Sequence, residues 1–207
     1  MSRILGAALS GVDGIPIEVE VRISSQLPRI DIVGLPEAAV RESAARVRAA
    51  ISAIGRTFPA RRVTVNLAPA GVRKSGAGLD LPIAIGILAA DGALEAIPEA
   101  NRPGALALFG ELALDGRLRA VRGALARTLC LASAGARRVI VPRENGPEAG
   151  LAPGIDVRIA EDLASVVESL AAGRELPRAP KAAAARSPDA ATRVDLRDIR
   201  GQARAKR

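Results

Sequence analysis

The chain has 207 residues, of which 49% are hydrophobic and 25% charged, and is long enough for one well-buried domain with an extension. It has no His and one cysteine, Cys130, which excludes an internal disulfide, a thiolate zinc site and Ser-His-Asp catalysis. Its longest apolar run is too short to cross a bilayer, and its start lacks the pattern of a signal peptide. We therefore expect a cytoplasmic location and no membrane partner.

The net charge of +8 is concentrated in the last part of the chain, because residues 171–207 carry +6 and residues 1–170 only +2. In the first 170 residues acids and bases are mixed, which is typical of an ordinary solvated surface. The aromatic content is 1%, with no Tyr or Trp, so the usual stacking platform for single-stranded nucleic acid is missing. Any DNA binding would therefore use Arg and Lys on phosphates.

The first third of the chain predicts a hairpin, a third strand and a helix. Residues 3–9 and 15–23 alternate apolar and polar side chains, which is typical of half-buried strands, and the turn residues 12–14 favour a hairpin between them. Residues 30–33 predict a short third strand. After a Gly-Leu-Pro break, apolar side chains recur at helical spacing from residue 39 to residue 54.

The rest of the chain predicts strands and helices in alternation. Strands are expected at 62–67, 105–112, 114–121, 138–141 and 157–159, and helices at 79–90, 123–134 and 162–171. Asp115-Gly116 between two of these strands is a strong hairpin signal. The predicted fold class is therefore α/β (α+β), a mixed and partly parallel sheet with helices packed on it.

A change of composition near residue 172 predicts a domain boundary. Beyond this point the chain is rich in Pro, Ala, Arg and Lys, which cannot bury enough apolar surface to fold. We therefore expect a folded domain over residues 1–172 and a Pro/Ala/Arg-rich linker over residues 173–193.

The glycine-containing loop 71–78 raises the question of phosphate binding, since Lys-Ser after glycines ends a P-loop. The spacing contradicts a P-loop, because Arg73 rather than Gly precedes Lys74 and the upstream glycine is missing. The simpler interpretation is a loop whose glycines allow unusual φ angles and whose Lys74 is solvated.

A Ser-Lys catalytic dyad is a second possibility, in which burial lowers a lysine pKa so that the amine can deprotonate a serine. Of the three lysines, only Lys74 lies outside the tail. Ser24 or Ser43 could be its partner, although nothing in the sequence marks such a pair.

Acidic side chains offer no clear pair for acid-base catalysis. Glu111 and Asp115 flank a predicted hairpin, and Asp80 opens a predicted helix, where an acid favours the N-terminal dipole. Structural roles explain all three better. Because His and paired Cys are also absent, no metal site is expected.

Five blocks of residues carry a resemblance to a known family. They are Ile32-Val33-Gly34-Leu35-Pro36 with Ala39-Val40-Arg41-Glu42-Ser43, Val65-Asn66-Leu67-Ala68-Pro69-Ala70, Lys74-Ser75-Gly76, Asp80-Leu81-Pro82-Ile83-Ala84, and Gly110-Glu111-Leu112 through Asp115-Gly116-Arg117. Over residues 1–172 these blocks resemble the N-terminal domain of ComM/YifB-type magnesium chelatase-like AAA+ ATPases. The family motif positions are Asn66, Pro69, Lys74, Ser75, Gly76, Asp80, Pro82, Gly110, Glu111, Gly116 and Arg117.

The resemblance implies a fold similar to the proteolytic domain of Lon, the ribosomal protein S5 domain 2-like class. In Lon-like proteases the catalytic serine follows a Lys-Asp-Gly-Pro stretch, and the corresponding position here is Gly78. The catalytic lysine belongs in the helix after the Gly-Glu hairpin, where ungapped counting gives Leu125. The resemblance therefore implies no catalytic residues here, and a Lon-like scaffold used for something other than peptide hydrolysis.

Residues 194–207 resemble the segment that enters the AAA+ module of this family, and are expected to be its start. In the family, a Walker A loop, a Walker B acid, sensor residues and an arginine finger follow, bind Mg-ATP and drive a hexameric ring. No cofactor is therefore expected in this chain, and the expected partners are a C-terminal AAA+ module and further copies of the parent. The chain is interpreted as a fragment, an engineered piece or a truncated gene product.

The leading hypothesis is a non-catalytic N-terminal domain whose parent resembles an ATP-dependent DNA helicase or branch-migration factor. The parent would act in recombination of incoming DNA during natural transformation, and this domain would be a docking or DNA-contacting collar. The possible DNA contacts are Arg61, Arg62, Arg73 and Lys74. The alternatives are a cryptic Lon-like serine peptidase and a protein-interaction or oligomerisation module. Metal insertion into a porphyrin, which the chelatase label implies, has no support in a chain without His or paired Cys.

Overall fold

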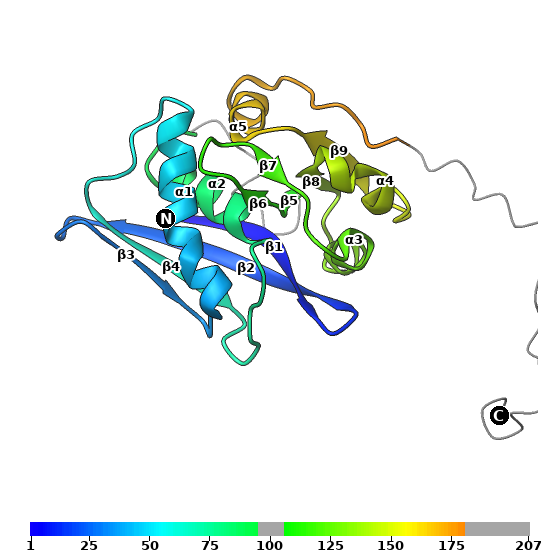
Figure 1. Ribbon diagram of the computed structural model, residues 1–207, viewed down its shortest axis with the longest axis horizontal. Coiled ribbons are helices and arrows are strands. Elements are labelled where there is room, and N and C mark those ends of the chain that lie inside the picture. The colour runs from blue at the N-terminus through cyan, green and yellow to red at the C-terminus, as the bar shows by residue number, and fades with distance from the viewer. Residues whose placement is uncertain (95–105, 181–207) are drawn as a thin grey trace, which may run out of the picture.

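The computed structural model describes residues 1–94 and 106–180 of the chain. Within these residues, a seven-stranded mixed sheet forms the framework (Figure 1). Its strands, in order across the sheet, are β3 (Arg29–Val33), β4 (Arg62–Ala68), β2 (Asp13–Ser24), β1 (Ser2–Ser10), β5 (Leu106–Leu108), β8 (Arg138–Pro142) and β9 (Asp156–Ala160). β2 is antiparallel to both β1 and β4, and the other neighbouring strands are parallel. The predicted mixed α/β class is confirmed.

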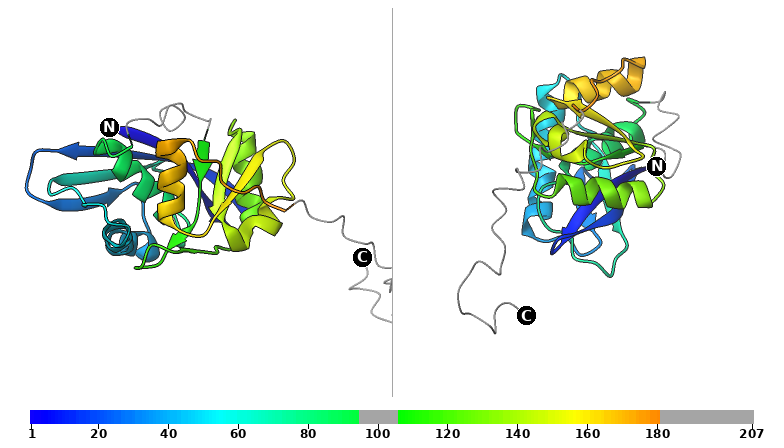
Figure 2. Two further views of the ribbon diagram at one scale, coloured as in Figure 1. Left: turned by 90° about the horizontal axis from the view of Figure 1, so that it is seen from above. Right: turned by 90° about the vertical axis from the view of Figure 1, so that its right-hand side faces the viewer.

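Helices cover the sheet on both faces. They are α1 (Ala38–Ala53), α2 (Asp80–Ala90), α3 (Ala124–Ser133), the 3-10 helix η1 (Arg143–Asn145), α4 (Gly146–Ala149) and α5 (Leu163–Ala172). Side chains of β1 alternate between two cores: Ile4 and Ala8 pack with α1, α2 and α5, and Ala7 packs with α3 and α4. Figures 1 and 2 place α3 and α4 at the end of the molecule away from β3.

The helix α2 lies at the centre of the larger core and is apolar nearly all round. Every residue from Asp80 to Leu88 is buried, with contacts to β1, β2 and α1. Gly86 allows the close approach of α2 to the sheet, because a Cβ there would lie 2.8 Å from Cγ2 of Val21. By contrast α1 buries a single face, as its helical spacing predicts.

The predicted strand 105–112 is broken after Leu108, and this was not foreseen. The chain turns away at Gly110, whose N–H donates to Gly78 and whose carbonyl accepts from Leu81. The hairpin around Asp115-Gly116 is confirmed, but its strands β6 (Glu111–Leu112) and β7 (Leu118–Arg119) form a separate two-stranded ribbon. The sequence pattern does not mark the break after Leu108, because apolar residues continue up to Gly110.

The folded domain extends past the boundary predicted at residue 172, which is therefore placed too early. Residues 173–180 continue along β9 in an extended path. The N–H of Ile159 donates to Pro177 at 2.9 Å, and the N–H of Ala179 donates to Val157 at 2.9 Å. The composition of this stretch is that of a linker, but its backbone completes the hydrogen bonding of an edge strand.

The remaining part of the expected linker, residues 181–193, lies outside the described residues. So do residues 194–207, the expected start of an AAA+ module, and residue 105 of the broken strand. In the described part of the chain, no helix is both long and apolar enough to span a membrane.

Candidate functional site

Lys74 lies in the loop between β4 and α2 and is fully buried. Its ammonium group donates to the carbonyl of Gly34 at 2.7 Å and to that of Pro69. Its backbone bonds the segment before α1, through the carbonyl of Leu35 at 3.2 Å and the N–H of Glu37 at 3.0 Å. Burial lowers the pKa of Lys74. The expectation of a solvated Lys74 is wrong, and this side chain fastens the loop to the turn before α1.

Asp80 is a fully buried carboxylate at the start of α2. It accepts hydrogen bonds from the hydroxyl of Ser43, from Nε of Arg46 at 2.6 Å and from the N–H of Leu112 at 3.1 Å. The hydrogen bond to Asp80 raises the pKa of Arg46. Ser43 is thus engaged with a carboxylate and not with Lys74, and the cluster joins α1, α2 and β6.

Sequence reasoning missed Arg46, although a signal was present. Arg46 follows Ser43 by three residues, so both side chains lie on the same face of α1. A buried aspartate requires a partner of opposite charge, and this face of α1 supplies it. Asp80 therefore has the expected structural role at the start of α2, and it also links α2 to α1 and β6.

Gly78 ends the same loop and faces Arg127 of α3. A Cβ built at Gly78 would lie 2.9 Å from Nη1 and 3.2 Å from Nη2 of Arg127. Leu125, the position found by ungapped counting, is half-buried, and its N–H donates to Glu148 at 3.0 Å. Counting along the sequence missed Arg127, because a count of residues does not say which face of the helix points toward Gly78.

Arg127 is 4% exposed. Its Nε donates to the carbonyl of Arg122 at 3.1 Å and its Nη1 to the carbonyl of Ala7, while Cζ lies 5.9 Å from the ring centre of Phe109. Burial lowers the pKa of Arg127 to about 10, and burial raises the pKa of Cys130 beside it to about 11. No carboxylate of the described residues pairs with Arg127, so its charge is buried without an acidic partner.

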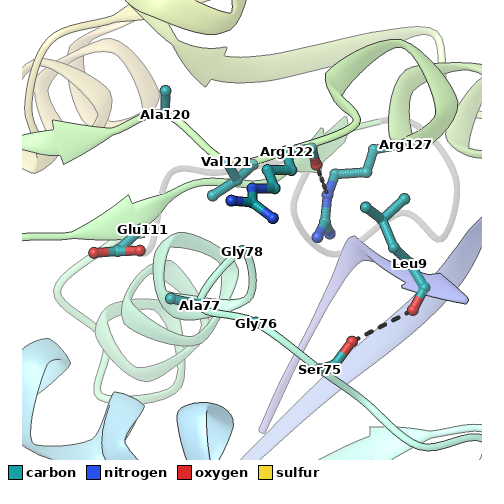
Figure 3. A pocket seen from close by; sticks show the side chains of 10 residues that line it. All are labelled: Leu9, Ser75, Gly76, Ala77, Gly78, Glu111, Ala120, Val121, Arg122 and Arg127. Carbon is teal, nitrogen blue, oxygen red and sulfur yellow. Dashed lines mark hydrogen bonds between the residues drawn. The ribbon is translucent and has the colours of Figure 1, made fainter. Parts of the chain in front are cut away.

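A pocket of about 370 Å³ opens beside Gly78 and Arg127 (Figure 3). The loop of residues 75–78 forms one wall, and the guanidinium groups of Arg122 and Arg127 project into the space beside Gly78. Glu111 lies on the other side of Gly78 from Arg127. The pocket therefore surrounds the position that the Lon resemblance assigns to a nucleophile, and presents two cations there.

Three further family motif positions have structural partners. Asn66 on β4 donates to Glu20 on β2 at 2.8 Å. Pro82 is buried in the first turn of α2, as expected for a proline at a helix start. Glu111 lies 3.9 Å from Arg119 across the β6–β7 ribbon.

The glycines and the arginine of the remaining motif positions shape turns. Gly76 and Gly116 have φ angles of 74° and 87°, in the left-handed region that favours glycine. The Nε of Arg117 donates to Asp115 at 2.8 Å, within the β6–β7 turn. The hydroxyl of Ser75 reaches the carbonyl of Leu9 only at 3.5 Å, so it is weakly engaged.

The structure does not bring the four possible DNA contacts together as free cations. Arg61 pairs with Asp91, and Arg62 pairs with Asp31 at 2.9 Å. Arg73 is exposed and has no ion pair among the described residues. The fourth candidate, the lysine next to Arg73, is fully buried and is removed from the patch.

A second charge cluster surrounds Asp156 at the outer edge of the sheet. Arg138 and Arg158 donate to it at 3.0 and 2.9 Å, and Arg178 lies 3.5 Å away. Burial alone would raise the pKa of Asp156, but the hydrogen bonds from Arg158 and Arg138 lower it overall. Across residues 1–94 and 106–180, no group of three His, Cys, Asp or Glu side chains is placed to hold a metal ion.

Comparisons with known proteins identify one family. The family model described as subunit ChlI of Mg-chelatase matches residues 19–145. The uncharacterized protein YifB of Escherichia coli is 44% identical over 207 residues, covering 100% of this chain and 39% of that protein. YifB of Salmonella typhimurium is 44% identical over 200 residues, covering 97% of this chain and 38% of that protein.

The competence protein ComM of Haemophilus influenzae is 38% identical over 209 residues, covering 100% of this chain and 40% of that protein. The chain thus spans about two fifths of the length of the curated relatives that it matches. With a family model that matches more than half of its residues, the chain belongs to the ChlI Mg-chelatase subunit family and resembles its YifB and ComM members.

Proposed function

We propose that the chain is the non-catalytic N-terminal domain of a longer YifB/ComM-like AAA+ ATPase that acts on DNA. The relatives are about two and a half times as long as this chain, which supports a longer parent. The name of the Haemophilus relative, competence protein ComM, supports a role of the parent in competence, for which we propose recombination of incoming DNA. In this proposal the parent binds Mg-ATP in another module, forms a hexameric ring and works as a helicase or branch-migration factor.

The non-catalytic role rests on one observation, the packing of Arg127 against Gly78. A Lon-type mechanism needs a nucleophile at this position and a base within hydrogen-bond reach. A side chain at Gly78 would overlap the guanidinium of Arg127, because even a Cβ would lie 2.9 Å from Nη1. The only lysine of the domain is bonded to two carbonyls elsewhere. These contacts favour a scaffold over a peptidase.

The DNA-contacting part of the proposal rests on three arginines. Arg61 and Arg62 lie at the start of β4, and Arg73 lies in the loop that follows this strand. Arg73 is free to bind a phosphate, and the other two are half-exposed ion pairs that phosphate can compete for. The test is fluorescence anisotropy of a labelled DNA fork with the 207-residue chain, at several salt concentrations. The triple change of these arginines to Gln is expected to weaken binding and to lower the salt slope by about 1 for each lost contact.

The matched control is the triple change of Arg137, Arg143 and Arg174 to Gln. It removes the same charge, and two of its arginines are exposed ion pairs, with Glu161 and Glu168. These positions belong to the other half of the molecule, so the control is expected to leave both affinity and salt slope close to wild type. Equal losses in both triple variants would instead indicate attraction by net charge alone.

A docking or oligomerisation role is the second candidate, and one observation favours it. Leu35 has a φ angle of 56°, a costly conformation for a large residue, yet its side chain is 54% exposed beside Val33, which is 46% exposed. The test is sedimentation of the longer protein with Leu35→Ser. The matched control is Leu151→Ser, because Leu151 is 53% exposed at a different place on the surface. Loss of the ring in the first variant alone would support docking, and an intact ring in both would reject it.

A further inference from the structure

We propose that the pocket beside Gly78 binds a phosphate group, either free phosphate or a phosphate monoester. This site is separate from the exposed arginines considered for DNA contact, and it does not depend on the function proposed above. The proposal rests on three features of the pocket: an uncompensated buried cation, an unused donor on that cation, and further donors that converge on the same space.

The first feature is the charge of Arg127, which is 96% buried and has no acidic partner among the described residues. Arg158, the other buried arginine of the described residues, pairs with Asp156. Lys74 is also buried without a carboxylate partner, but its ammonium group donates to two carbonyls and does not line this pocket. Removing an unpaired charge from water is costly, so an anion that enters the pocket would stabilise Arg127.

The second feature is the free Nη2 of Arg127. Nε and Nη1 donate to the carbonyls of Arg122 and Ala7, and these bonds fix the plane of the guanidinium. Nη2 makes no hydrogen bond. Among the described residues, every fully buried side-chain nitrogen or oxygen has a hydrogen-bond partner, so Nη2 is not fully buried. Nη2 is therefore open to the pocket, and a Cβ at Gly78 would lie 3.2 Å from it.

The third feature is the convergence of donors from three segments of the chain. Arg127 comes from α3, Arg122 from the segment before it, and Ser75 from the loop before α2 (Figure 3). The Ser75 hydroxyl is only weakly engaged, at 3.5 Å from the Leu9 carbonyl, so it is available to an anion. Donors that approach from separate directions suit a tetrahedral phosphate better than a planar carboxylate.

The absence of a side chain at Gly78 lets the guanidinium of Arg127 lie beside the loop, where it lines the pocket. The pocket measures about 370 Å³, which accommodates a phosphate and a small ester group. Its one acid among the described residues, Glu111, lies on the other side of Gly78 from Arg127 (Figure 3), and its carboxylate is 3.9 Å from Arg119. The side of the pocket that holds Arg122 and Arg127 is therefore positive, as a phosphate site requires.

The experiment is a titration of the ¹⁵N-labelled 207-residue chain with inorganic phosphate, followed by the backbone amide signals of Gly76 and Gly78. We expect saturable shifts at these two signals, and an affinity about tenfold weaker in Arg122→Gln, since a charge-assisted bond is lost. Arg122 is exposed, so this change leaves the fold intact. Gly78→Ala is the second variant and is expected to weaken binding, because the new methyl group displaces the guanidinium of Arg127.

The control variant is Arg56→Gln, because Arg56 is an exposed arginine with no side-chain partner among the described residues. It is expected to bind phosphate as the wild type does. A 5′-phosphorylated dinucleotide and its dephosphorylated form separate the sources of the phosphate. Tighter binding of the phosphorylated dinucleotide than of inorganic phosphate assigns a monoester, and the reverse assigns free phosphate. Absence of saturable shifts with either probe, or equal weakening by Arg122→Gln and Arg56→Gln, would overturn the proposal.

Discussion

The guanidinium of Arg127 occupies the space that a side chain at Gly78 would need, with Nη1 2.9 Å from the position of a Cβ there. The two residues lie 49 positions apart in the sequence and meet where the loop before α2 reaches α3. This contact excludes a serine at Gly78 unless Arg127 moves. It also leaves a buried cation facing the pocket.

Replacing Gly78 by Ser is expected to destabilise the domain by about 1–3 kcal/mol, because the new side chain overpacks against Arg127. The measurement is the urea midpoint of unfolding. Gly71→Ser in the same loop is the control, since a Cβ there meets nothing within 4 Å, and it should change stability by less than about 0.5 kcal/mol. Equal midpoints for the two variants would show that Gly78 is not packed as described.

Asp80→Asn is expected to cost roughly 3–5 kcal/mol of unfolding free energy, because it breaks the ion pair of a fully buried carboxylate and leaves Arg46 with only the exposed Glu42 as an acidic neighbour. Glu42→Gln removes another carboxylate near Arg46, at 3.7 Å, but the Glu42 side chain is 72% exposed. This control should cost less than about 0.5 kcal/mol. Calorimetry of both variants tests whether the burial of Asp80, rather than its charge alone, holds α1, α2 and β6 together.

Leu176→Ala is expected to cost about 2 kcal/mol, because Leu176 is only 8% exposed although it lies in the stretch predicted to be a linker. Leu151→Ala is the control, since Leu151 is 53% exposed and its truncation should change stability by less than about 0.5 kcal/mol. If Leu176→Ala were as mild as the control in urea unfolding, residues 173–180 would not belong to the cooperative domain.

Asp156 gives the domain a defined response to acid. Its arginine partners hold its folded-state pKa below the ordinary value of 3.8, so the unfolded chain binds the proton more readily. The contribution of Asp156 is therefore complete above about pH 5 and is lost as the pH falls through 3.8 and below. Between pH 5 and pH 3, the difference in stability between wild type and Asp156→Asn should shrink. A difference independent of pH would contradict the ion-pair geometry.

Periodicity predicted the elements whose pattern is local. The alternation in residues 3–9 and 15–23 gives the β1–β2 hairpin, and the helical spacing from residue 39 to residue 54 gives α1. Periodicity failed where a backbone contact decides. The bonds of Gly110 to Gly78 and Leu81 break an otherwise continuous apolar strand, and no local pattern reports them. The same holds for residues 173–180, which β9 orders despite their composition.

For the candidate site, the sequence identified the loop but not its partners. The resemblance pointed to Gly78 as an empty nucleophile position, and the glycine-containing loop does line a pocket. Arg127 and Arg46 were missed because each acts through a residue distant in sequence. The sequence places Lys74 at the surface because a lysine is rarely buried, and only the structure shows the two carbonyls that accept hydrogen bonds from its ammonium group.

Casein hydrolysis by the purified 207-residue chain tests the central claim most directly, namely that this domain does not cleave peptides. We expect no cleavage above the buffer blank for the wild type, because Gly78 supplies no nucleophile and Lys74 is bonded to Gly34 and Pro69. Cleavage that is present in the wild type and lost on changing Ser75 to Ala would contradict the account and make the chain a peptidase.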